Sequence, residues 1–310
     1  MAALDALLPV WAVRWRWGLV QQSLRRKLLE RDDFDWAFPG EESAGATEAR
    51  RPLRLVAGVD ISFFVGPDAL EDTRACVALV VCELDAAAGT AEVVWEDYAY
   101  VDMTEPYVAG YLAFREVPHH GALLRRLRRE RPDLAPDVVL VDGNGVLHPR
   151  GFGCASHLGV VCDVCTVGVA KNLHLVDGLE ASEVKRLVDG VAQGGHVPLV
   201  GGSGRVWGAA LLPSPARPVA PKRAQVPPKN PIYVSVGHRI SLESAVRAVG
   251  LCCLSARVPE PVRLADIRSR ELVRQAKEDP SRLAHLRSPG APPAAPARWL
   301  AGLAGLASLA

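Results

Sequence analysis

The chain has 310 residues, enough to bury a large core as one elaborated domain or as two small ones. Its 36 lysines and arginines nearly cancel its 35 aspartates and glutamates, so net charge argues neither for nor against a nucleic-acid partner. No apolar run reaches transmembrane length, and arginines interrupt the apolar residues near the start, which argues against a signal peptide.

The first half of the chain predicts a helix, three strands and a second helix. Residues 7–31 carry leucines and tryptophans at helical spacing with arginines between them, which predicts an amphipathic helix. A polar linker follows over 40–52. The next predicted elements are strands over 53–64, 73–84 and 91–101, and a helix with an early proline over 109–132.

The second half alternates strands and helices. Residues 137–142 and 165–171 are short apolar runs, as expected of parallel strands that are buried on both faces. The remaining predictions are helices over 180–190, 241–253 and 261–278, and strands over 196–200, 205–212 and 232–238. This order predicts an α/β fold in which helices cover a mixed sheet.

We expect a single catalytic domain over 51–278, preceded by a helix and linker over 1–50. Residues 213–231 hold seven prolines and no hydrophobic periodicity, which predicts a flexible insertion in that domain. The Ala/Pro-rich segment 279–310 is predicted to be a disordered tail.

The stretch VDGNGVLHPRGFGCASHLG, residues 141–159, places one carboxylate ahead of five glycines. Asp142 is expected to end a buried strand, and ligands of open α/β sheets bind beyond such strand ends. If 53–64 pairs with 137–142 in parallel, Asp60 lies beside Asp142, and Glu116 can lean over both. Clustered carboxylates need a cation, and oxygen ligands favour Mg²⁺ or Mn²⁺. The alternative is that each acid only caps a turn.

Five blocks in order carry a family resemblance: GVDISF, PYVAGYLAFRE, VDGNGVLHPRGFGCASHLGV, VGVAK and VSVGHRISLESAV. Together they resemble endonuclease V, a family that cuts nucleic acid beside inosine. The resemblance covers roughly Arg54 to Arg257. It implies a ribonuclease H-like mixed sheet flanked by helices and a phosphodiesterase that depends on Mg²⁺, with Mn²⁺ as a substitute.

The resemblance also implies catalytic residues. The metal-binding acids of the family fall on Asp60, Glu116 and Asp142, and its lysine falls on Lys171, where an ammonium can stabilise phosphoryl charge. Its histidine falls on His238, which is expected to assist the metal-bound water or a second cation site. The alternative is that this histidine, which follows a strand, is structural.

A base pocket is expected next to Asp142. PYVAG resembles the wedge of the family, with the aromatic kept at Tyr107 and a proline of many members replaced by Ala109. Hypoxanthine presents O6 and N1–H, and glycines let backbone donors and acceptors approach both. The alternative is that these glycines only shape tight turns. The expected pocket residues are Leu112, Gly143, Asn144, Gly145, His148, Gly151 and Gly153.

The expected activity is an Mg²⁺-dependent endonuclease that cuts one bond beyond the phosphodiester adjacent to inosine on its 3′ side. Inosine-containing single-stranded RNA is the preferred substrate, because the cysteine usage, the insertion and the tail resemble eukaryotic members, for which RNA is expected. DNA is the weaker substrate. The alternatives are a repair endonuclease acting at deoxyinosine in DNA and a protein that binds inosine-containing RNA without cutting it.

The seven cysteines indicate where the protein works. Cys162 and Cys165 form a CxxC motif, but no second ligand pair at zinc spacing accompanies it, so buried free thiols are expected. Free thiols indicate a reducing intracellular compartment. We therefore expect the protein in the cytoplasm and the nucleus, including the nucleolus, with no membrane partner.

Overall fold

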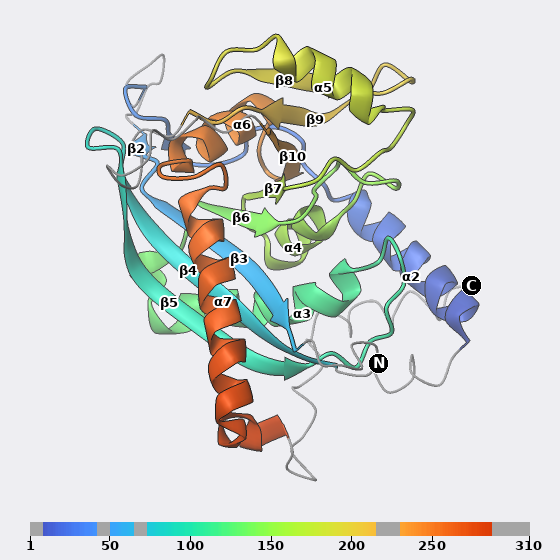
Figure 1. The fold of residues 1–310 in the computed structure, drawn as a ribbon, viewed down its shortest axis with the longest axis vertical. Helices are drawn as coiled ribbons and strands as arrows, with labels where there is room; N and C mark the ends of the chain where they lie inside the picture. Colours follow the sequence, from blue (N-terminus) through green and yellow to red (C-terminus); the bar gives the residue numbers. More distant parts are fainter. Residues whose placement is uncertain (1–8, 42–49, 65–72, 215–229, 287–310) are drawn as a thin grey trace.

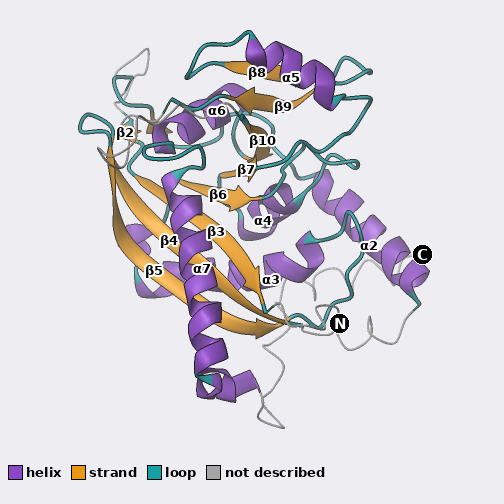
Figure 2. Cartoon of the chain, viewed as in Figure 1, coloured by secondary structure: helices purple, strands orange, loops and turns teal. Residues whose placement is uncertain are grey.

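The structure is a computed structural model, and it describes residues 9–41, 50–64, 73–214 and 230–286. An eight-stranded mixed sheet forms its centre, with the strands in the order β5-β4-β3-β6-β7-β10-β9-β8 (Figures 1 and 2). β6 is parallel to both β3 and β7, and the other neighbours are antiparallel. The strands are β3 (Leu55–Phe63), β4 (Arg74–Asp85), β5 (Thr90–Asp102), β6 (Val138–Asp142), β7 (Thr166–Ala170), β8 (His196–Val200), β9 (Val206–Leu211) and β10 (Ile232–His238).

Helices cover both faces of the sheet, as expected. The side chains of β6 alternate: Val138 and Leu140 join the apolar layer under α6 and α7, whereas Val139 and Val141 join the layer under α3 and α4. α5 packs on β8 and β9 at the end of the sheet. The helices are α2 (Val10–Arg25), α3 (Ala113–Glu130), α4 (Cys154–Cys162), α5 (Ala181–Asp189), α6 (Leu242–Cys252) and α7 (Glu260–Glu278).

A glycine lets α7 approach β3 closely. A Cβ atom at Gly58 would lie 2.2 Å from the backbone carbonyl carbon of Pro261, in the first turn of α7. Only glycine can accept backbone at that distance. The helix therefore crosses directly over β3 (Figure 1), and Ser269 reaches the strand, where its hydroxyl lies 2.7 Å from that of Ser62.

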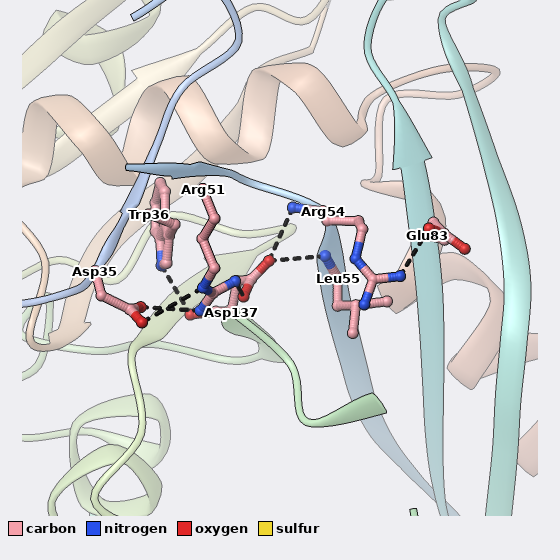
Figure 3. A network of polar contacts seen from close by, with 7 residues as sticks. All are labelled: Asp35, Trp36, Arg51, Arg54, Leu55, Glu83 and Asp137. Carbon is pink, nitrogen blue, oxygen red and sulfur yellow. Dashed lines mark hydrogen bonds and ion pairs between the residues drawn. The ribbon is translucent and has the colours of Figure 1, made fainter. Parts of the chain in front are cut away.

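A buried carboxylate joins the beginnings of β3 and β6 (Figure 3). Asp137 Oδ2 accepts hydrogen bonds of 2.8 Å from the backbone N–H groups of Arg54 and Leu55. Its Oδ1 accepts a hydrogen bond from Arg51, and Trp36 Nε1 donates to its backbone oxygen at 3.2 Å. These contacts set the parallel pairing of β3 and β6.

Some expected boundaries were wrong. The N-terminal helix is shorter than 7–31, because α2 spans Val10–Arg25. Residues 154–162, for which no element was predicted, form α4. The first residues of the expected tail, Pro280–Leu286, form a 3₁₀ helix in which Leu283 is buried. The insertion and the rest of the tail lie mainly outside the described residues.

All seven cysteines are free thiols, Cys162 and Cys165 among them. Two further elements are short: β1 (Trp36–Ala37) pairs in parallel with β2 (Arg51–Pro52). Within the described ranges, no helix combines the length and the apolar character that a membrane span needs.

Candidate active site

Two acids meet at the carboxyl ends of the central parallel strands. In the pairing of β3 with β6, Val59 lies opposite Val141, so Asp60 and Asp142, the next residues, lie side by side. Asp60 is only 9% exposed. The sequence analysis placed the two acids side by side on the condition that these strands pair in parallel, and the register shows that they do.

Two helices bring two more carboxylates to the same strand ends. Glu116, in the first turn of α3, is buried, and its Oε2 lies 3.6 Å from the Cys154 thiol. Asp266 comes from α7. Lys171 joins the group, because its Nζ lies 2.7 Å from Asp142 Oδ2 and 3.8 Å from Asp266 Oδ2. The site therefore contains four carboxylates and a lysine.

The sequence analysis missed Asp266. It lies in the charge-rich helical segment 261–278, where acids alternate with arginines as on a solvated helix face. Only the crossing of α7 over β3 carries it to Asp60. Ser269, one turn further, also faces the site, since its hydroxyl donates to Asp60 Oδ2 at 3.2 Å.

Burial and mutual repulsion shift the protonation of these acids. Burial raises the pKa of Asp60 to about 7, and the negative charges of Asp142 and Asp266 add to the rise. Burial also raises the pKa of Glu116 to about 7, although the hydrogen bond from Cys154 opposes the rise. For Lys171, burial is the largest single influence and opposes protonation, but the hydrogen bond with Asp142 and the negative charges of Asp142, Asp266 and Asp60 together outweigh it and raise the pKa. The site is therefore short of positive charge.

The donors at this site fit a hard divalent cation. Among the described residues, no three acidic, histidine or cysteine side chains are already grouped as the ligands of one ion. The chemistry nevertheless points to one, because the four carboxylates supply only oxygen atoms and repel one another through their charges. Asp60, Glu116, Asp142 and Asp266 are the residues that would hold it.

His238 does not lie with the acids. β10 is antiparallel to β7, so His238 lies opposite Thr166, the first residue of β7, whereas Asp142 lies opposite Val169, near its end. His238 Nδ1 accepts a hydrogen bond from the backbone N–H of Leu29 at 3.2 Å. The expected position of His238 beside the metal-binding acids was therefore wrong, and its contacts are those of a structural residue.

The wedge loop, residues 103–112, joins β5 to α3. Tyr107 is 69% exposed and Leu112 is 39% exposed, so both side chains can contact a ligand. Behind them, Tyr111 is buried, and the Arg150 guanidinium carbon lies 3.8 Å from the centre of its ring. Arg150 also donates to the backbone oxygen of Gly110. The loop thus has an exposed tip on an anchored base.

The glycine loop, residues 143–153, is tightly packed. A Cβ atom at Gly145 would lie 1.9 Å from the backbone oxygen of Val236, and one at Gly153 would lie 2.3 Å from that of Asn144. These two glycines therefore allow backbone segments to touch, which favours the turn interpretation for them.

The N–H groups of this loop are also used inside the fold. Gly143 donates to Val169, Gly151 to His148 and Gly153 to Gly145, at 2.7–2.9 Å. These three N–H groups therefore already have acceptors inside the fold, and the expected role of the glycines as walls of a base pocket stays a prediction. Gly145 likewise donates, to Ser235 Oγ at 2.9 Å.

Two polar side chains remain at the glycine loop. Asn144 Oδ1 is buried without a hydrogen-bond partner among the described residues, and its Nδ2 lies 3.4 Å from His174 Nδ1. His148 is buried, and burial lowers its pKa to about 4, so its ring is neutral at pH 7. Its Nδ1 accepts from the Arg150 N–H at 3.2 Å.

Comparison with known proteins identifies the family. The family model for Endonuclease V matches residues 41–267, well over half of the chain. Endonuclease V of Mus musculus is 45% identical over 261 residues, which cover 84% of this chain and 69% of the mouse protein. The chain belongs to the endonuclease V family. The matched region ends at residue 267 and so includes Asp266.

Solved endonuclease V structures share the fold. A crystal structure of human endonuclease V matches with a TM-score of 0.70 at 44% identity, covering 84% of this chain and 98% of the human one. Ciona intestinalis endonuclease V matches with a TM-score of 0.69 at 30% identity, covering 86% and 99%. Its crystals contain a 23mer DNA with an inosine followed by a ribo-adenosine. The expected ribonuclease H-like fold is confirmed.

Proposed function

We propose that this protein is a metal-dependent endonuclease that acts at inosine, preferentially in single-stranded RNA. It cuts one bond beyond the phosphodiester adjacent to inosine on its 3′ side. The observation that carries the proposal is the convergence of Asp60, Glu116, Asp142 and Asp266 with Lys171 at the ends of β3 and β6. A protein that only bound inosine would have no use for a buried, mutually repelling acid cluster.

Each residue of the cluster has a defined task in this proposal. The carboxylates hold Mg²⁺, or Mn²⁺ in its place, which when bound supplies a Lewis acid and lowers the pKa of water. Lys171 carries a positive charge beside Asp142. A phosphate that approaches the strand ends meets this ammonium, which stabilises the charge that develops on its oxygens. Ser269 keeps the Asp60 carboxylate oriented through its hydrogen bond.

The inosine base lies between the wedge loop and the glycine loop. Tyr107 at the exposed tip occupies the space that the base leaves in its strand. Leu112 supplies an apolar wall, and Asn144 Oδ1, buried without a partner in the described residues, is an acceptor for N1–H. Gly143, Gly145, Gly151 and Gly153 shape this pocket, and His148 borders it as a neutral side chain.

Two arguments favour RNA over DNA. The wedge carries Ala109 where many family members carry proline. The loop is therefore less rigid and less suited to separating the strands of a duplex. RNA also offers a 2′-hydroxyl beside the cleaved bond. The DNA used with the Ciona relative carried a ribonucleotide at the corresponding place, directly after inosine. The free thiols fit a reducing intracellular compartment, and we propose the cytoplasm and the nucleus, including the nucleolus.

The test uses matched oligonucleotides that contain one inosine. The first set changes only the ribose that follows inosine to deoxyribose, and we expect cleavage to fall at least about tenfold, a difference of about 1.4 kcal/mol in barrier. Equal rates across this set would favour the DNA repair alternative. A second oligonucleotide carries adenosine in place of inosine and should stay intact.

Metal dependence is measured with the same substrates. Chelation should stop cleavage, and Mg²⁺ or Mn²⁺ should restore it. Asp142→Asn is expected to abolish cleavage while the protein still binds RNA in Ca²⁺. If the wild-type protein binds inosine-containing RNA but does not cleave it whichever divalent metal is added, the non-cleaving alternative is correct.

A further inference from the structure

The solvent face of α2 carries large apolar side chains. Trp11 is 72% exposed, Trp15 is 67% exposed and Leu19 is 48% exposed. Their spacing of four residues places them on one face of the helix. Single exposed apolar residues are ordinary, but a row that contains two tryptophans marks an interaction surface.

This face is also basic. Arg14 and Arg25 are exposed, and α2 contains no aspartate or glutamate. At 100° per residue, the two arginines lie on the same side of the row, next to Trp11 around the helix and away from Leu19. The surface therefore carries guanidinium groups along one edge of a row of aromatic and apolar side chains, and its charge is complementary to a polyanion.

The opposite face of α2 is joined to both substrate loops. Val13 and Trp17 pack with Val108 and Tyr111 of the wedge loop. Figure 1 shows this loop rising beside α2. These contacts hold α2 against the wedge loop, beside the proposed inosine site.

Polar contacts fasten the helix to the glycine loop as well. Gln21 Nε2 donates to the backbone oxygen of Phe152 at 2.7 Å, and Arg150 donates to Gln21 Oε1. The Arg25 guanidinium also lies within 3.0 Å of the place where a Cβ atom of Gly151 would be. The helix is thus a fixed part of the rim of the site.

We propose that the exposed face of α2 is a second nucleic-acid contact, which binds nucleotides of a single strand outside the inosine pocket. Unpaired bases stack on Trp11 and Trp15, and backbone phosphates contact Arg14 and Arg25. The proposal rests on the proposed function. It also adds a physical cause for the preference for single strands, since a duplex keeps its bases stacked on one another.

The first experiment measures fluorescence anisotropy of labelled uridine RNAs without inosine, in EDTA. The variant Trp11→Ala/Trp15→Ala is compared with the wild type on RNAs about 8 and about 20 nucleotides long. We expect a loss of affinity of at least about fivefold on the longer single strand, the loss that one base stack gives. A duplex of the same length should bind both proteins equally.

Two controls accompany this variant. Tyr98→Ala removes an exposed aromatic ring from β5, away from α2, and should bind as the wild type does. The thermal unfolding midpoint of the double variant should match that of the wild type, because both tryptophans are exposed. Its turnover of a short inosine RNA should also be unchanged, which separates the α2 face from the active site.

The second experiment tests the arginines. Arg14→Gln/Arg25→Gln should lower the slope of log affinity against log salt by about 0.7 for each lost phosphate contact. Wild-type binding of the long RNA by the double tryptophan variant would overturn the proposal. A basic helix that carries tryptophans also suits a lipid surface. The proposal would also be overturned if the double tryptophan variant lost binding to vesicles of anionic phospholipid while its RNA binding stayed unchanged. The binding of uridine RNA still tests the α2 face even if the wild type fails to cut inosine RNA, because it is measured without cleavage.

Discussion

Asp266 and Lys171 determine the charge balance at the strand ends. Lys171 Nζ lies between Asp142, at 2.7 Å, and Asp266, at 3.8 Å. Asp266 also adds negative charge that raises the pKa of Asp60. An acid in this position strengthens the attraction of the site for a cation and holds the lysine in place.

We therefore expect Asp266→Asn to lower turnover of an inosine oligonucleotide at least about 100-fold, as the loss of one electrostatic group in an active site does. Binding of the same oligonucleotide in Ca²⁺ should change little. Glu278→Gln, at the exposed end of α7, is the matched control. Turnover equal to that of the wild type would show that Asp266 takes no part in the reaction.

Tyr107 gives a second prediction at this scale. Its ring is 69% exposed at the tip of the wedge loop, so its removal leaves the fold intact. Tyr107→Ala should weaken binding to an inosine-containing duplex by about 1–3 kcal/mol, the range for one aromatic stack. The effect on a single strand should be smaller, because a single strand has no gap to fill. Tyr107→Phe keeps the ring and should bind normally; equal losses on both substrates would mean that Tyr107 is not a wedge.

At the scale of elements, Asp137 places β3 against β6 and so aligns the two acids at their far ends. Its Oδ2 accepts from two backbone N–H groups, those of Arg54 and Leu55, at the entry of β3 (Figure 3). Glu83 forms a nearby ion pair with Arg54, but both side chains are nearly half exposed. The buried contact should therefore contribute more to stability than the exposed one.

Asp137→Ala should lower the free energy of unfolding by about 1–3 kcal/mol, because two strand N–H groups lose their acceptor. Glu83→Ala should lower it by less than about 1 kcal/mol, as the loss of an exposed ion pair does. Urea unfolding of the three proteins measures both values. Equal midpoints for the two variants would contradict this ranking.

At the scale of the whole molecule, buried histidines and buried acids make stability depend on pH in opposite directions. Burial lowers the pKa of His120 to about 3, so below about pH 6.5 the unfolded chain binds a proton that the folded chain refuses. Protonation of His120 in the unfolded chain therefore lowers the free energy of unfolding as the pH falls from 6.5 towards 3. Burial raises the pKa of Asp60 to about 7, so the folded chain keeps a proton that the unfolded chain loses above about pH 4. The free energy of unfolding therefore falls as the pH rises from about 4 to 7.

His120→Gln isolates the histidine contribution. Between pH 7 and pH 5 the stability of the wild type relative to this variant should fall by about 2 kcal/mol, because only the wild type has to keep the imidazole uncharged. Urea unfolding at the two pH values measures it. His196→Gln, at an exposed histidine, is the control for the loss of an imidazole. No change for His120→Gln would mean that His120 is protonated inside the fold.

The sequence by itself determined most of the sheet and the three acids that belong to it or to its first covering helix. Apolar residues precede Asp60 and Asp142, and parallel pairing of the two strands in the observed register places these acids side by side. The five sequence blocks pointed to the family, and the family match confirms this. Local patterns were sufficient because these residues lie within or directly after regular elements.

Only the tertiary structure decided the fourth acid and the histidine. Asp266 reaches Asp60 because Gly58 lets α7 lie directly on β3, a contact between segments about 200 residues apart that no local pattern records. His238 lies away from the acids because β10 is antiparallel to β7. The last residue of β10 therefore lies beside the first residue of β7, whereas the acids lie near the end of β7. Strand direction and helix crossing are set by packing across the whole chain, and they determined which charged side chains meet.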